Sequence, residues 1–97
     1  MIARLTKVEV PPDKFDEVIQ SVGGLPGGLA VVREASGSKG VLLMADRTSG
    51  KIVMVTLWET AAAMEASNTV RDTLLARVAA LGATMTSTEV VEVLAQL

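Results

Sequence analysis

The clearest hydrophobic pattern in the chain is a pair of apolar runs on either side of a short turn. Residues 40–46 (GVLLMAD) and 51–58 (KIVMVTLW) flank the sequence Arg-Thr-Ser-Gly at positions 47–50. Two apolar runs joined by a short turn that contains glycine are typical of a β-hairpin. We therefore expect two antiparallel strands in the middle of the chain.

Two further segments, one near each end of the chain, also have the composition of strands. Residues 2–10 (IARLTKVEV) are rich in β-branched residues and are followed by two prolines, which favours a strand that stops there. Residues 84–94 begin with alternating threonines and continue with a valine-rich stretch. We expect one strand in each segment.

Apolar residues at helical spacing predict a helix after the first strand. Apolar side chains recur at i, i+3, i+4 and i+7 from Phe15 to Val22, and the glycine pair at 23–24 ends this helix. Residues 25–35 are ambiguous, because their apolar spacing fits a helix while residues 30–32 could form a strand. We expect a short second helix in this segment.

A longer helix is expected over residues 61–81. Thr60 is a good N-cap, Gly82 can close the last turn, and the Asn-Thr pair at 68–69 is a weak point inside the helix. The element order is then β-α-β-β-α-β, the ferredoxin-like arrangement of an α+β fold. We expect a single domain over residues 1–97, with helices on one face of a four-stranded antiparallel sheet.

The predicted hairpin has more apolar surface than helices on one face can cover. Alternate side chains of residues 52–58 point to opposite faces of the sheet, and both sets are mainly apolar, as they are in residues 41–45. Apolar residues make up 49% of the chain and charged residues only 21%. We therefore expect a homodimer that buries the open sheet faces against each other. The alternative is a monomer whose C-terminal residues fold over the sheet.

The amino-acid composition excludes several classes of function. Histidine and cysteine are both absent, which excludes disulfides, thiol nucleophiles, histidine bases, histidine-ligated haem and ordinary zinc sites. A net charge of −2 gives no reason to expect nucleic acid or an anionic membrane as a partner. No apolar stretch has the length of a spanning helix, and no signal-peptide pattern follows Met1. We expect a cytoplasmic protein that uses no metal and no cofactor.

Several short segments of the chain carry a family resemblance. They are the Val-Glu-Val-Pro end of the first strand, the Ser-Gly-Ser-Lys-Gly entry at 36–40, the hairpin turn at 45–51 and, most specifically, Leu-Trp-Glu-Thr at 57–60 before an alanine-rich helix. Together they resemble the antibiotic biosynthesis monooxygenase (ABM) superfamily of small dimeric α+β barrels. The resemblance implies a pocket between sheet and helices in each subunit. It also implies cofactor-independent oxygenation, since the haem-degrading branch needs an axial histidine that this chain lacks.

The resemblance places a pocket tryptophan at the end of the third strand, which falls on Trp58. Its ring could stack on a flat ligand while its indole N–H donates a hydrogen bond. Alternatively, Trp58 is a core anchor that pins the strand to the helices. Thr56 shares the face of Trp58 and could hydrogen-bond a ligand, although threonine is also common in strands for its β-propensity alone.

The other candidate binding residues are Arg4, Thr6, Asn68 and Arg71. In the family's orientation Arg4 and Thr6 face the helices, where Arg4 could bind an anionic group; alternatively it is a strand-end arginine that reaches to water. Asn68 and Arg71 are three residues apart and lie on adjacent faces of the long helix. They could line the pocket, or Arg71 could form an ordinary surface ion pair. No residue is assigned a catalytic role.

The function expected from these features is binding of a hydrophobic or aromatic small molecule in the helix–sheet pocket. Cofactor-independent oxygenation is the enzymatic form of this expectation. The alternative is a non-catalytic barrel with a ligand-binding, structural or accessory role.

Overall fold

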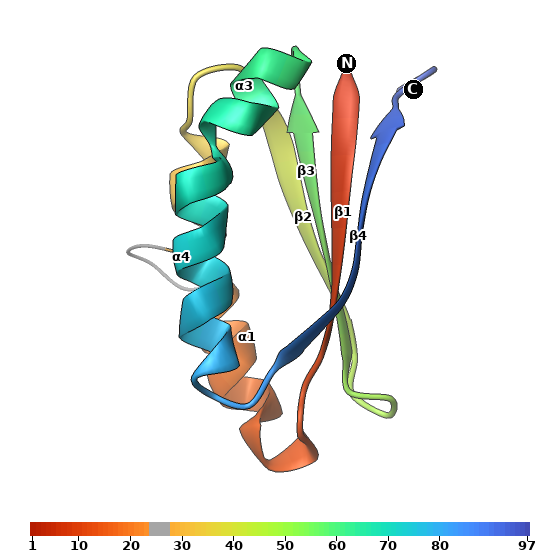
Figure 1. The fold of residues 1–97 in the computed structure, drawn as a ribbon. Helices are drawn as coiled ribbons and strands as arrows, with labels where there is room; N and C mark the ends of the chain where they lie inside the picture. Colours follow the sequence, from red (N-terminus) through yellow and green to blue (C-terminus); the bar gives the residue numbers. More distant parts are fainter. Residues whose placement is uncertain (24–27) are drawn as a thin grey trace.

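Strands and helices follow one another in the predicted order (Figure 1). The computed structural model describes residues 1–23 and 28–97. Its elements are β1 (Ile2–Glu9), the short 3-10 helix η1 (Pro12–Lys14), α1 (Phe15–Gly23), α2 (Leu29–Arg33), β2 (Ser38–Asp46), β3 (Lys51–Trp58), α3 (Ala61–Ala66), α4 (Asn68–Ala79) and β4 (Thr84–Glu92). The α+β class and the four-stranded antiparallel sheet are confirmed.

The sheet has the strand order β2-β3-β1-β4, and each neighbouring pair is antiparallel. The first strand therefore lies inside the sheet, between the hairpin and the last strand. Both ends of the chain lie at the same end of the molecule (Figure 1), where the Val93 N–H donates to the Met1 carbonyl at 2.9 Å. The pairing sets Arg4 opposite Thr56 across β1 and β3.

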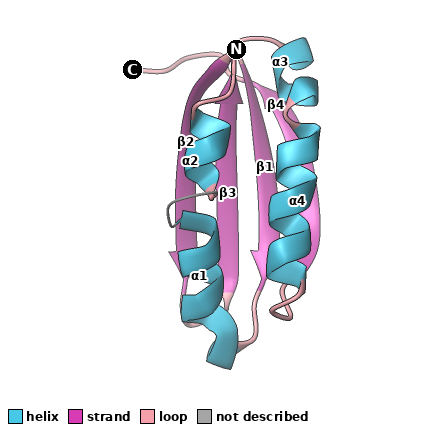
Figure 2. Ribbon diagram, turned by 90° about the vertical axis from the view of Figure 1, so that its left-hand side faces the viewer, coloured by secondary structure: helices cyan, strands magenta, loops and turns pink. Residues whose placement is uncertain are grey.

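The helices form one layer on one face of the sheet (Figure 2). In this layer α1 and α2 lie on the β2 side, and α3 and α4 lie on the β4 side. The predicted stripe of α1 is buried at Phe15, Val18 and Val22. The core between the two layers is built mainly from Val8, Phe15, Val18, Val22, Leu29, Val32, Ile52, Met54, Trp58, Leu74 and Val78.

The prediction of one long helix over residues 61–81 is wrong, because the chain forms two helices that meet at Ser67. The Ser67 hydroxyl donates to the Met64 carbonyl at 2.6 Å, and such side-chain bonds compete with the regular helical ladder. The expected weak point at 68–69 lies one residue after this break. Thr60 is the predicted N-cap, since its Oγ1 accepts from the Ala63 N–H at 3.1 Å.

The ambiguous segment after α1 is helical where the structure describes it. Residues Leu29–Arg33 form α2, which confirms the expected short helix, while residues 24–27, including one glycine of the predicted helix end, lie outside the described residues. Within the described parts of the chain, no helix is long and apolar enough to cross a membrane.

The face of the sheet that points away from the helices is apolar on its β2 and β3 strands. Val53, Val55 and Leu57 alternate with the buried residues of β3 and are half-buried on this open face. Leu42 and Met44 of β2 pair with Val55 and Val53 and remain 55% and 47% exposed. The predicted excess of apolar surface is therefore present in the folded subunit.

Candidate functional site

The candidate site lies where β1 and β3 pair beneath the helical layer. Because side chains alternate along a strand, Arg4 and Thr6 point to the same face as Val8, toward the helices. The same alternation puts Thr56 on the helix-facing side of β3, directly opposite Arg4. The three polar side chains are therefore brought together under α4 in a largely apolar interior.

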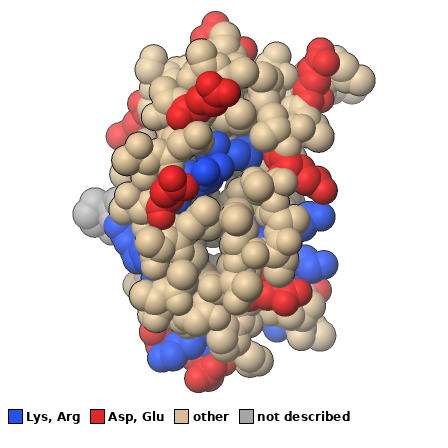
Figure 3. Space-filling view, in the orientation of Figure 1, with Lys and Arg blue, Asp and Glu red and all other residues tan. Residues whose placement is uncertain are grey.

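A cavity opens between these strands and the helices. Its polar lining consists of Arg4, Thr6, Thr56 and Arg71, and its apolar lining of Leu29, Val32, Met54, Leu74 and Leu75. Figure 3 shows a hollow on the side of the molecule where α4 faces the sheet, with basic side chains along one margin. Four of the predicted binding residues thus share one cavity wall.

The cavity is narrow. The space between its walls amounts to about 330 Å³ when the open mouth is included, but the centre of a water molecule can reach only about 20 Å³ of it. On this measure one water molecule needs roughly 10–15 Å³, so the inner space holds one or two. A ring-sized ligand requires wall side chains to move, and Met54 is the most adaptable of them.

Arg4 is a buried cation held by neutral groups. The residue is only 4% exposed. Its Nη1 donates to the Asn68 Oδ1 at 2.7 Å, and its Nη2 donates to the Ser67 Oγ at 3.1 Å. Burial lowers the pKa of the Arg4 guanidinium, the positive charge of Arg71 lowers it further, and Asp72 acts in the opposite direction. The group stays protonated, because arginine does not lose its proton in proteins.

Arg71 is the second cation of the cavity wall. Its Nε and Nη2 donate to the Asp72 Oδ1 at 3.2 and 3.1 Å, and its side chain is 30% exposed. Arg71 therefore forms an ion pair with the adjacent Asp72 and lines the cavity as well. Within the described residues, no carboxylate forms a hydrogen bond or ion pair with Arg4.

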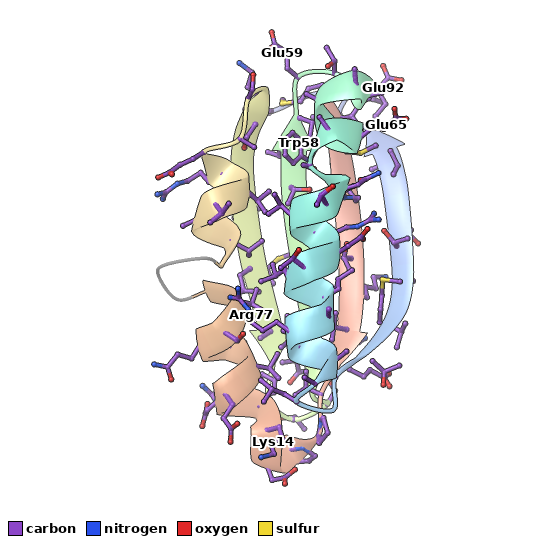
Figure 4. The ribbon with its side chains drawn as sticks, turned by 60° about the vertical axis from the view of Figure 1, so that its left-hand side comes forward. Lys14, Trp58, Glu59, Glu65, Arg77 and Glu92 are labelled. Atoms are coloured by element: carbon purple, nitrogen blue, oxygen red, sulfur yellow. The ribbon has the colours of Figure 1, made fainter. Side chains whose placement is uncertain are left out.

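Trp58 lies behind the cavity wall rather than on it. The residue is fully buried, and Figure 4 shows it enclosed between β3 and the α3 end of the helical layer. Its indole N–H donates to the Thr56 Oγ1 at 2.9 Å. The structure thus places Trp58 as a core anchor with its one hydrogen-bond donor already used, and Thr56 is the residue that connects it to the cavity.

Asn68 is likewise one step removed from the cavity, where it accepts the hydrogen bond from Arg4. Sequence reasoning missed Ser67, the second acceptor for Arg4. The signal for it was the weak point in the predicted long helix, because a polar residue at a helix break can turn its side chain inward. In the described residues, no group of His, Cys, Asp or Glu side chains is arranged to hold a metal ion.

The β-α-β-β-α-β order, with the helices on one face of an antiparallel sheet, defines a ferredoxin-like α+β protein. Comparison with protein families narrows this class, because the family described as Antibiotic biosynthesis monooxygenase matches residues 1–73. The chain belongs to this family. No curated protein matches the chain.

Solved structures share the fold across nearly the whole chain. A Deinococcus radiodurans protein that carries the same family description has a TM-score of 0.81 at 14% identity, covering 100% of this chain and 96% of its own. The NE2512 protein of unknown function from Nitrosomonas europaea has a TM-score of 0.77 at 18% identity, with 99% and 91% covered. SnoaB, a cofactor-independent oxygenase from Streptomyces nogalater, has a TM-score of 0.66 at 15% identity, with 99% and 95% covered. At these identities the likeness shows the fold alone.

Proposed function

We propose that the chain binds an apolar or aromatic small molecule in the cavity between the helical layer and the sheet. The observation that carries this proposal is the wall itself, where Arg4, Thr6, Thr56 and Arg71 converge on an otherwise apolar space from β1, β3 and α4. Apolar walls with a few placed polar groups are the usual composition of small-molecule sites. If these four side chains served only to solvate the protein surface, they would not need to lie on one wall of an interior cavity.

The reaction that we propose for this cavity is cofactor-independent oxygenation. In such a reaction the substrate supplies all the electrons: an activated CH₂ group loses its two hydrogens, one oxygen atom of O₂ becomes the new carbonyl and the other leaves as water. The protein orients the substrate and excludes bulk water. Membership of the monooxygenase family and the shared fold with SnoaB support this reaction.

Oxygen uptake with a panel of anthrone- and quinol-type compounds tests the reaction. We expect uptake above the uncatalysed rate, and weaker uptake for Leu75→Phe, which enlarges a side chain on the cavity wall. Leu81→Phe is the matched control, because Leu81 is also a half-buried leucine but does not line the cavity. Equal oxygen uptake by Leu75→Phe and Leu81→Phe would show that the reaction does not take place in this cavity. No uptake with any compound of the panel would count against an oxygenase.

A non-catalytic role is the second candidate, and two observations favour it. The inner space is small, about 20 Å³ for the centre of a water molecule, and the Trp58 N–H is already bonded to Thr56 rather than directed at a ligand. Under this alternative the same compounds either bind without oxygen uptake or do not bind at all. Amide chemical shifts of cavity residues, followed by NMR during ligand addition, separate these outcomes.

We also propose that two copies pack through their open sheet faces. The exposed side chains of Leu42 and Met44 and the half-buried valines of β3 form an apolar surface of a kind that usually marks an interaction site. A second copy presents the same surface, so a two-fold arrangement would cover both at once. A cytoplasmic location for such a dimer remains a prediction.

A further inference from the structure

The charges on the cavity wall do not balance. Arg4 and Arg71 contribute two positive charges. Among residues 1–23 and 28–97, Asp72 is the one carboxylate that acts on Arg4 or pairs with Arg71, which leaves one net positive charge beside the cavity. Arg4 is 4% exposed, so water screens its charge poorly, and a buried charge without a charged partner is costly. A ligand with a single negative charge would restore the balance.

The donors available on the two guanidinium groups fit such a ligand. Each guanidinium has five N–H donors. The described contacts of Arg4 use one on Nη1 and one on Nη2, and those of Arg71 use Nε and one on Nη2. Donors therefore remain on both groups, and both groups line the same cavity. Forked guanidinium donors match the two oxygens of a carboxylate.

We propose that the cavity selects amphipathic carboxylates, with the apolar part of the ligand against Leu74 and Met54 and its carboxylate between Arg4 and Arg71. This inference rests on the proposed function, because it assigns a ligand class to the same cavity. A phosphate ester is a poorer fit, since its charge of about −2 near neutral pH exceeds the single net positive charge of the wall. A neutral aromatic compound would leave that positive charge uncompensated.

Binding of benzoate, benzamide and phenyl phosphate, measured by NMR titration of the full chain, tests the selection. Benzoate and benzamide have nearly the same shape and differ in charge. We expect benzoate to bind on the order of tenfold to a hundredfold more tightly than benzamide, which is the range for hydrogen bonds to a charged group. Equal affinities would overturn the inference and leave the proposed binding function standing. Tighter binding of phenyl phosphate would overturn the choice of carboxylate, and no binding of any probe would overturn both proposals.

Substitution of the two arginines assigns the selection to the cavity wall. Arg4→Met and Arg71→Met should each bring the benzoate and benzamide affinities close together, mainly by weakening benzoate. Arg33→Met is the matched control, because Arg33 is exposed on α2 and does not line this cavity, and it should keep the wild-type ratio. If Arg4→Met does not fold, the affinity ratio of benzoate to benzamide in Arg71→Met, compared with the ratio in the wild type, still tests the inference, because Arg71 is partly exposed. A preference for benzoate that survives Arg71→Met would place the anion elsewhere.

Discussion

The hydrogen bond from Trp58 to Thr56 joins the core of the protein to the wall of the cavity. Both residues are buried and lie two positions apart on one face of β3. A buried indole N–H needs an acceptor, and the hydroxyl of Thr56 provides it. Thr56 therefore has a structural task as well as a place on the cavity wall, and the two can be separated by substitution.

Thr56→Val tests the structural task. Valine has nearly the shape of threonine but cannot accept a hydrogen bond, so the Trp58 N–H would be left buried without a partner. We expect the free energy of unfolding to fall by about 1–3 kcal/mol, measured by denaturant unfolding. Thr88→Val is the matched control on β4, where the threonine is exposed, and it should change stability by less than about 0.5 kcal/mol. Equal losses in the two variants would show that the Trp58 bond contributes little.

The break between α3 and α4 is the element-scale feature that holds Arg4. Ser67 is the junction of the two helices, and Asn68 is the first residue of α4. A continuous helix would carry these residues on a regular spiral, whereas the break lets both side chains reach one guanidinium from a neighbouring layer. The break between α3 and α4 and the position of the buried Arg4 guanidinium therefore both depend on the Ser67–Asn68 sequence.

The elements could be predicted because their signals are local, and the contacts of the site could not. Strand alternation put Arg4 and Thr6 on one face of their strand and Thr56 on the face of Trp58, and turn residues located the hairpin. The family resemblance, not the alternation, indicated that Arg4 and Thr6 face the helices. The contact of Arg4 with Asn68 joins residues 64 positions apart and depends on the strand order and on the helix break, which no short pattern encodes. The acceptor of the Trp58 N–H, Thr56, is only two residues away in the sequence. Whether that N–H bonds to Thr56 or points toward a ligand depends, however, on how tightly the helices pack on the sheet, which the sequence does not encode locally.

The loop before β2 packs closely against the start of α3 and the residue that follows β3. Gly37 has a φ of 83°, its carbonyl accepts from the Glu59 N–H at 2.8 Å, and a Cβ added to it would lie 2.5 Å from the Ala63 Cβ. We expect Gly37→Ala to lower the free energy of unfolding by about 2–5 kcal/mol, from the left-handed backbone and the overlap with α3 together. Thermal and denaturant unfolding measure this loss.

A double-mutant cycle with Ala63→Gly separates the two causes. Glycine at position 63 removes the overlapping methyl group and costs about 1 kcal/mol through its lower helix propensity. If the overlap contributes, Gly37→Ala will be less destabilising in the Ala63→Gly background than in the wild type. An unchanged effect would assign the whole loss to the backbone conformation at Gly37.

At the scale of the whole molecule, the two faces of the sheet are both apolar but only one is covered. On the open face, Val55 of β3 lies next to Leu42 of β2 and Leu5 of β1. The β4 edge is more polar there, since Glu89 is the residue that pairs with Leu5. The apolar surface is thus concentrated on the hairpin side, which is where a second copy would bury the most.

The proposed dimer can be tested at the centre of this surface. Val55→Glu places a charge in the expected interface, where its burial against a second copy would be costly, while in a single subunit it remains half-exposed. We expect the wild type to sediment as a dimer and Val55→Glu to sediment largely as a folded monomer, with circular dichroism confirming the fold. Val31→Glu, at a position 42% exposed on α2, is the matched control and should remain dimeric. A wild type that stays monomeric across a dilution series reaching high concentration would refute the dimer, and the uncovered apolar face would then need another explanation.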